Sequence, residues 1–83
     1  MLTPAGRDGF RASSLAIRLG CEVRELVSFV GWRQPAVLGA AGDLAMQIRS
    51  AGGRWSASEG AILFPSWSSL EEVLEELLIG RRN

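Results

Sequence analysis

The side chains with the most specific chemistry in this chain are its arginines. All nine basic residues of the 83-residue sequence are arginine. A guanidinium group binds phosphate oxygens through several N–H donors, so arginines are natural contacts for a nucleic-acid backbone. The residues that we expect to contact phosphate are Arg24, Arg33, Arg49 and Arg54.

Two of the three tryptophans are candidates for contact with another molecule. Trp32 follows Gly31, and Trp67 lies between Pro65 and the last predicted helix, so both stand at the ends of elements. Exposed tryptophans beside arginines are typical of protein interface anchors and of platforms on which unpaired bases stack. A predicted protein-binding surface combines Trp32 and Trp67 with two acidic residues of the last helix, Glu71 and Glu75.

The residue types that are absent exclude several classes of enzyme. The sequence contains no histidine, no lysine and no tyrosine, and it has one cysteine, Cys21. A histidine general base, a Schiff-base lysine and a P-loop lysine are therefore excluded. The carboxylates show no metal-ligand spacing. We expect no catalytic residue, no metal site and no cofactor, and a single cysteine cannot form an internal disulfide.

The net charge is zero, but the charge is divided between the two parts of the chain. Residues 1–54 hold seven arginines and four acidic residues, whereas residues 55–83 hold two arginines and five glutamates. A surface of this kind can bind a polyanion on one side or pair with a charged protein, and solvated faces without such a role produce the same pattern.

The chain length and the glycine and proline positions predict one compact domain over residues 13–83, preceded by a flexible arm over residues 1–12. Ser13 or Ser14 is a suitable N-cap for a helix that ends at Gly20. The spacing of apolar residues from Val23 to Val30 predicts a second short helix that ends near Gly31.

The segment 35–51 allows two arrangements. Pro35 suits a first helical turn, and apolar residues trace one face as far as Gly52. Gly39 and Gly42 each cost about 1 kcal/mol relative to alanine within a helix. Either one long helix spans the segment, or a turn at Gly42 leads into a shorter helix over 43–51 that Asp43 caps.

A β-hairpin and a final helix are predicted for the remaining residues. Residues 54–56 and 61–64 form the two strands, and Trp55, Ile62 and Phe64 are expected to point inward. Ser68 or Ser69 opens the last helix with a capping box. Its apolar face comprises Leu70, Val73, Leu74, Leu77 and Leu78. The predicted fold class is therefore α+β, a small single domain with the order helix–helix–helix–β-hairpin–helix.

Residues 15–26, LAIRLGCEVREL, resemble the helix-turn-helix pattern. The residues that carry the resemblance are Leu15, Ala16, Leu19, Gly20 and Leu26. The resemblance implies that a second helix enters the DNA major groove and presents Arg24 together with Glu22, Glu25 and Ser28. A structural helical corner without DNA contact is the alternative, because two glutamates flank the arginine.

The C-terminal part resembles a unit of the HARP domains of annealing helicases and of other small modules from bacterial mobile elements. The matching residues are Gly52, Gly53, Arg54, Trp55, Phe64, Pro65, Leu70 and Leu74. The resemblance implies a helix–hairpin–helix module, associated with DNA in some relatives. Together with the first motif it suggests a winged-helix layout with the hairpin as the wing.

Two functions from different classes follow. The first is a small nucleic-acid-binding module, such as a regulator encoded by a mobile element. The alternative is a protein-binding inhibitor or adaptor, for example a phage or plasmid protein that blocks a host complex. We expect a cytoplasmic protein without a membrane segment, because no signal sequence or apolar span is visible. The small residues at 39–42 could pack within a monomer or across a homodimer.

Overall fold

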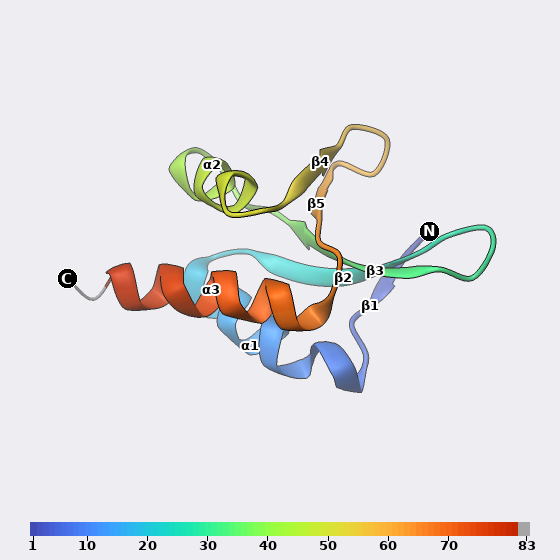
Figure 1. The fold of residues 1–83 in the computed structure, drawn as a ribbon, viewed down its shortest axis with the longest axis horizontal. Coiled ribbons are helices and arrows are strands. Elements are labelled where there is room, and N and C mark those ends of the chain that lie inside the picture. Colours follow the sequence, from blue (N-terminus) through green and yellow to red (C-terminus); the bar gives the residue numbers. More distant parts are fainter. Residues whose placement is uncertain (82–83) are drawn as a thin grey trace.

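A computed structural model describes the backbone of residues 1–81 and shows a small α+β domain (Figure 1). Its elements in chain order are β1 (Leu2–Pro4), the 3₁₀ turn η1 (Arg7–Gly9), α1 (Phe10–Leu19), β2 (Glu22–Val27), β3 (Arg33–Leu38), α2 (Asp43–Ser50), β4 (Arg54–Ser56), β5 (Ala61–Leu63) and α3 (Trp67–Arg81). The five strands form one antiparallel sheet in the order β1-β2-β3-β5-β4. None of the helices in the described part of the chain is long and apolar enough to cross a membrane.

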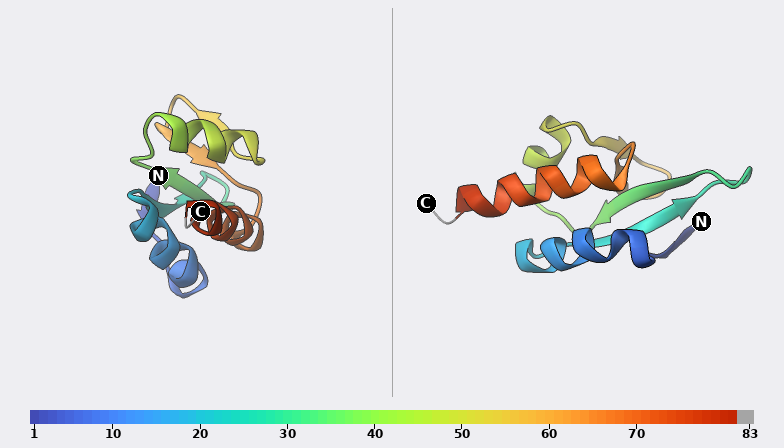
Figure 2. Two further views of the ribbon diagram at one scale, coloured as in Figure 1. Left: turned by 90° about the vertical axis from the view of Figure 1, so that its left-hand side faces the viewer. Right: turned by 60° about the horizontal axis from the view of Figure 1, so that its bottom comes forward.

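The main core lies between one face of the sheet and the three helices. Val23, Val37 and Ile62 stand in register on neighbouring strands, so their side chains share a face. They belong to one buried cluster that also contains apolar residues of α1, α2 and α3. Helices α1 and α3 pack against each other below the sheet, and α2 lies beside β4 and β5 (Figure 2).

The opposite face of the sheet carries a smaller apolar cluster. Ala36, Ala61 and Leu63 are buried there, at strand positions that alternate with those of the main core. Three half-buried leucines complete this cluster, namely Leu2, Leu26 and Leu38. None of its members belongs to a helix, so in the described chain the face is closed by side chains of the sheet itself.

The last helix and the hairpin before it agree with the sequence-based prediction. Strands β4 and β5 pair as expected, and Ile62 and Phe64 are each 2% exposed. Leu70, Val73 and Leu74 are buried, and Leu77 and Leu78 pack against the same core. The capping residue differs from the prediction, because the Ser66 hydroxyl accepts the backbone N–H of Ser69 at 3.2 Å and α3 already begins at Trp67.

The predicted second helix is wrong, and with it the helix-turn-helix pattern. Gly20 ends α1 in the left-handed conformation, as expected, but residues 22–27 then form β2. Val23 pairs with Val37 across the sheet. Apolar residues at 23, 26, 27 and 30 have the spacing of a helix face, but the segment is short, and pairing with β1 and β3 outweighs this local pattern. Arg24 therefore lies on a strand and not on a recognition helix, and the winged-helix layout does not form.

The first part of the segment 35–51 is also a strand. Residues 33–38 form β3, and α2 begins only at Asp43. Gly39 and Gly42 have φ angles of +76° and +57°, which a helix cannot contain. The shorter of the two predicted helices is therefore the one observed. Its predicted cap is absent, since no side chain caps α2. The predicted order helix–helix–helix–hairpin–helix is wrong, although the α+β class is confirmed.

The first residues are part of the domain and do not form a separate arm. Leu2–Pro4 pair with β2 as an edge strand, and α1 begins at Phe10, inside the segment assigned to the arm. The amino group of Met1 donates to the Val27 carbonyl at 3.0 Å, and the Val27 N–H donates to the Met1 carbonyl at 2.8 Å. The compact domain thus begins with the first strand. Residues 82 and 83 of the predicted domain lie outside the described part of the chain.

Candidate nucleic-acid interface

Arg49 and Trp55 lie side by side and are candidate functional side chains of different types. Arg49 lies in the last turn of α2, and Trp55 is the central residue of β4. The guanidinium carbon of Arg49 is 6.0 Å from the centroid of the Trp55 ring, at the outer limit of a cation–π contact. Two chain segments thereby bring a permanent positive charge and a large aromatic surface together.

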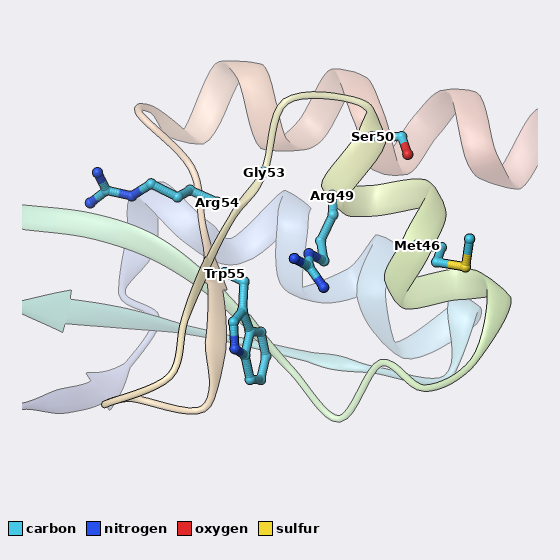
Figure 3. Close-up of a pocket in the computed structure, with 6 residues that line it drawn as sticks. All are labelled: Met46, Arg49, Ser50, Gly53, Arg54 and Trp55. Atoms are coloured by element: carbon cyan, nitrogen blue, oxygen red, sulfur yellow. The ribbon is translucent and has the colours of Figure 1, made fainter.

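A groove of about 550 Å³ surrounds this pair. Its lining comes from the second half of α2 and the start of β4, and comprises Met46, Arg49, Ser50, Gly53, Arg54 and Trp55 (Figure 3). Met46 is exposed and adds an apolar side chain to the lining on the α2 side. The groove is therefore mixed in character, with cationic, aromatic and aliphatic groups.

The prediction that Trp55 points into the core is wrong, because 48% of its surface is exposed. Its cross-strand partner is Ile62, so the indole does lie on the face of the sheet that the helices cover. However, β4 is the edge strand, and beside it α2 presents the polar side chain of Arg49. The helix covers Ile62 and leaves the ring of Trp55 half open to solvent.

Arg54 stands at the rim of the groove. In Figure 3 its side chain extends away from Arg49 and Trp55, as alternation along a strand requires for the residue before Trp55. Within residues 1–80, whose side chains are described, no ion pair involves Arg49 or Arg54. Both guanidinium groups can therefore bind an anion without first losing a carboxylate partner.

Arg24 and Arg33, the other two arginines predicted to contact phosphate, are each paired with a glutamate. Arg24 Nε lies 3.3 Å from a carboxylate oxygen of Glu22, and Arg33 donates to Glu25 at 2.7 Å. Both arginines lie on the hairpin formed by β2 and β3, here called the central hairpin, away from the groove. Of the four predicted arginines, the structure thus brings together Arg49 and Arg54 and leaves the other two elsewhere.

Trp32 lies at the tip of the hairpin that connects β2 and β3. This tip protrudes at one end of the long axis, opposite the C-terminus (Figure 1). Trp32 is 72% exposed, and Phe29 and Val30 in the same turn are also exposed. The turn is held by bonds of the Ser28 N–H to the Trp32 carbonyl at 2.7 Å and of the Trp32 N–H to the Ser28 hydroxyl at 3.0 Å.

The remaining members of the predicted protein-binding surface lie apart from Trp32. Trp67 is half-buried and packs against the main core, with its ring directly over Gly9. Glu71 and Glu75 both pair with Arg11, at 3.6 Å and 2.7 Å. These carboxylates connect α3 to α1, so they contribute first to helix packing.

Trp55, Met46, Phe29 and Val30 are the candidate residues that sequence reasoning missed. A signal for Trp55 was present, because a three-residue strand between two turns is short enough to be an edge strand. A signal for Phe29 and Val30 was the Phe-Val-Gly-Trp run, in which a glycine among large apolar residues is typical of a turn.

Comparisons with known proteins do not identify the chain. No family model matches it, no curated protein matches it, and no solved structure matches it.

Proposed function

We propose that the protein is a small nucleic-acid-binding module that uses the groove between α2 and β4. The observation that carries this proposal is the position of Arg49 beside the half-exposed ring of Trp55, with neither Arg49 nor Arg54 in an ion pair among the described side chains. Arginine and tryptophan are the residue types that bind phosphates and base faces respectively.

The charge of the whole molecule limits the strength of such binding. With a net charge of zero, the protein does not attract a polyanion over a long range. Attraction comes from two local cations, so few phosphates are neutralised. We therefore expect weak binding, with a dissociation constant on the order of 10⁻⁴ to 10⁻⁶ M, that decreases only moderately with salt.

The test is a titration of labelled single-stranded and duplex oligonucleotides, followed by fluorescence anisotropy at several salt concentrations. Each phosphate contact contributes about 0.7 to the slope of log K against log salt for single strands, and about 0.9 for duplex DNA. Arg49→Gln is expected to weaken binding and to reduce this slope by about one such contact. Arg54→Gln is expected to do the same to a smaller extent, because Arg54 stands at the rim of the groove and its side chain extends away from Arg49 and Trp55.

Arg18→Gln is the matched control. Arg18 is an exposed arginine on α1, and no ion pair among the described side chains involves it. If Arg18→Gln and Arg49→Gln reduce binding equally, the groove is not the site. If no oligonucleotide binds at low salt, the proposed function is wrong.

A protein-binding function is the second candidate, and the tip of the central hairpin supports it. Phe29, Val30 and Trp32 project from one turn, and Met1 beside them is also exposed. Rigid aromatic side chains are common anchors of protein interfaces, because little conformational entropy is lost when they bind. An adaptor or inhibitor with its contact surface at this tip would fit these features.

This second function is tested by affinity capture with a double variant, Phe29→Ala with Trp32→Ala. A partner bound through the tip is expected to be lost from this variant and retained by Ile17→Ala, which removes an apolar residue of α1 that is about as exposed as Trp32. A partner that the double variant retains would place the contact elsewhere.

A further inference from the structure

The groove has the dimensions of a site for part of one strand. It is an open depression of about 550 Å³, which has room for about one or two nucleotides lying against it and not for a longer segment. A duplex is recognised by an element that enters a groove, and by phosphate contacts spread along the backbone. Residues 1–81 do not contain the predicted recognition helix, since β2 occupies its place.

The orientation of the groove residues is suited to a base that is not paired. The guanidinium of Arg49 lies on one side of the Trp55 ring, and the ring remains half exposed. Every base has an aromatic face, so stacking on tryptophan is available only where a base is unstacked from its own strand. An intact duplex has its base faces covered and offers nothing to this ring.

Arg54 supplies the second contact. It precedes Trp55 on the edge strand β4, and its side chain lies on the other side of that strand (Figure 3). A strand of nucleic acid that crosses the edge would meet Trp55 with a base and Arg54 with a neighbouring phosphate. Ser50 contributes the one neutral hydroxyl of the lining, and in this arrangement the two guanidinium groups are occupied beside the stacked base and at a phosphate, not at base edges.

We infer that the groove binds one or two unpaired nucleotides of a single strand, with a base stacked on Trp55 beside Arg49 and an adjoining phosphate on Arg54. This inference rests on the proposed nucleic-acid-binding function and names its substrate class. Binding is tolerant of sequence, because stacking and phosphate contacts do not read base edges.

The test compares equal-length single strands with a duplex of the same length, at one low salt concentration. Oligo-dT and oligo-U are used to compare DNA with RNA. Binding of either one counts as binding of an unpaired strand. The variants are Trp55→Ala, Trp55→Leu and Trp55→Phe. Trp55→Leu keeps apolar volume without an aromatic face, and Trp55→Phe keeps the face. Trp32→Ala is the control, because it removes an exposed tryptophan at the hairpin tip.

We expect the single strands to bind more tightly than the duplex. Loss of one stacked base corresponds to about a 5- to 150-fold weaker affinity for Trp55→Ala. Trp55→Leu is expected to match it and is used in its place if the alanine variant does not fold. Trp55→Phe is expected to stay within about threefold of the wild type, and Trp32→Ala to leave binding unchanged.

Two other outcomes separate this inference from the proposed function. One outcome is that the duplex binds as tightly as the single strands; another is that Trp55→Leu binds normally while Arg49→Gln binds weakly. Either of these overturns the inference of base stacking on Trp55 and leaves the proposed nucleic-acid-binding function standing. If no single strand and no duplex binds, both are overturned.

Discussion

At the scale of single residues, the three tryptophans occupy three different environments. Trp32 is exposed at a turn, Trp55 is half exposed beside an arginine, and Trp67 is half-buried over Gly9. The environment decides what each ring can do. Indole surface in contact with the core stabilises the fold, whereas indole surface in contact with water is available to a ligand.

The first prediction compares the two extreme cases. Trp67→Ala is expected to lower the free energy of unfolding by about 2 kcal/mol or more, since it removes core contacts of a large side chain. Trp32→Ala is expected to change it by no more than about 0.5 kcal/mol, because its ring lies in solvent. Urea denaturation measures both. Equal losses would contradict the assignment of Trp67 to packing and of Trp32 to the surface.

At the scale of elements, the connection between α2 and β4 determines the shape of the groove. The backbone of Gly53 passes close to Ile62 and Phe64 of the core, and a β-carbon placed there would lie 3.1 Å from the Ile48 carbonyl oxygen. This close approach holds the end of α2 against the hairpin. The distance between Arg49 and Trp55 therefore depends on a residue without a side chain.

The second prediction concerns this approach. Gly53→Ala is expected to cost about 1–3 kcal/mol of stability, because the new methyl group overpacks the contact with Ile62. Gly6→Ala is the matched control. At Gly6 a β-carbon would have no heavy atom within 4 Å, and φ is −84°. There alanine is expected to leave stability unchanged or to raise it by about 0.4–1 kcal/mol. Thermal melting of both variants checks this difference, and an equal effect would exclude steric overlap.

At the scale of the whole molecule, the strand order separates two surfaces. Strand β1 forms one edge of the sheet, and β4, with the groove, forms the other. The hairpin tip lies close to the first edge, where Met1 pairs with Val27. A change at the first edge can therefore affect stability without a direct effect on the groove.

The third prediction uses this separation. Deletion of residues 1–5 removes β1, its hydrogen bonds to β2 and the contacts of Leu2 on the open face of the sheet. We expect a loss of about 1–3 kcal/mol in stability, with oligonucleotide affinity per folded molecule unchanged. Leu2→Ala separates the side-chain contribution from that of the backbone pairing. An unchanged melting temperature would show that these residues behave as the loose arm that the sequence predicted.

The sequence by itself determined the elements whose pattern is long or strongly punctuated. Helix α3 has a continuous apolar face from Leu70 to Leu78, about two and a half turns, and Gly52-Gly53 with Pro65 mark the limits of the hairpin. The absence of histidine and lysine excluded several catalytic mechanisms without any knowledge of the fold. The helix and the limits of the hairpin depend on residues close together in sequence, and local interactions are sufficient to decide them.

Only the tertiary structure decided the state of residues 22–38 and the exposure of Trp55. The apolar positions of residues 22–27 have helical spacing, but a six-residue segment is too short for this local pattern to be decisive, and pairing with residues far away in sequence made it a strand. Val23 of β2 pairs with Val37 of β3, and β1, formed by residues 2–4, pairs with the other edge of β2. Trp55 is exposed because β4 is the edge strand and because the α2 side chain beside its ring is the polar Arg49. Which strand lies at an edge is a property of the whole sheet, so a local sequence pattern does not determine it.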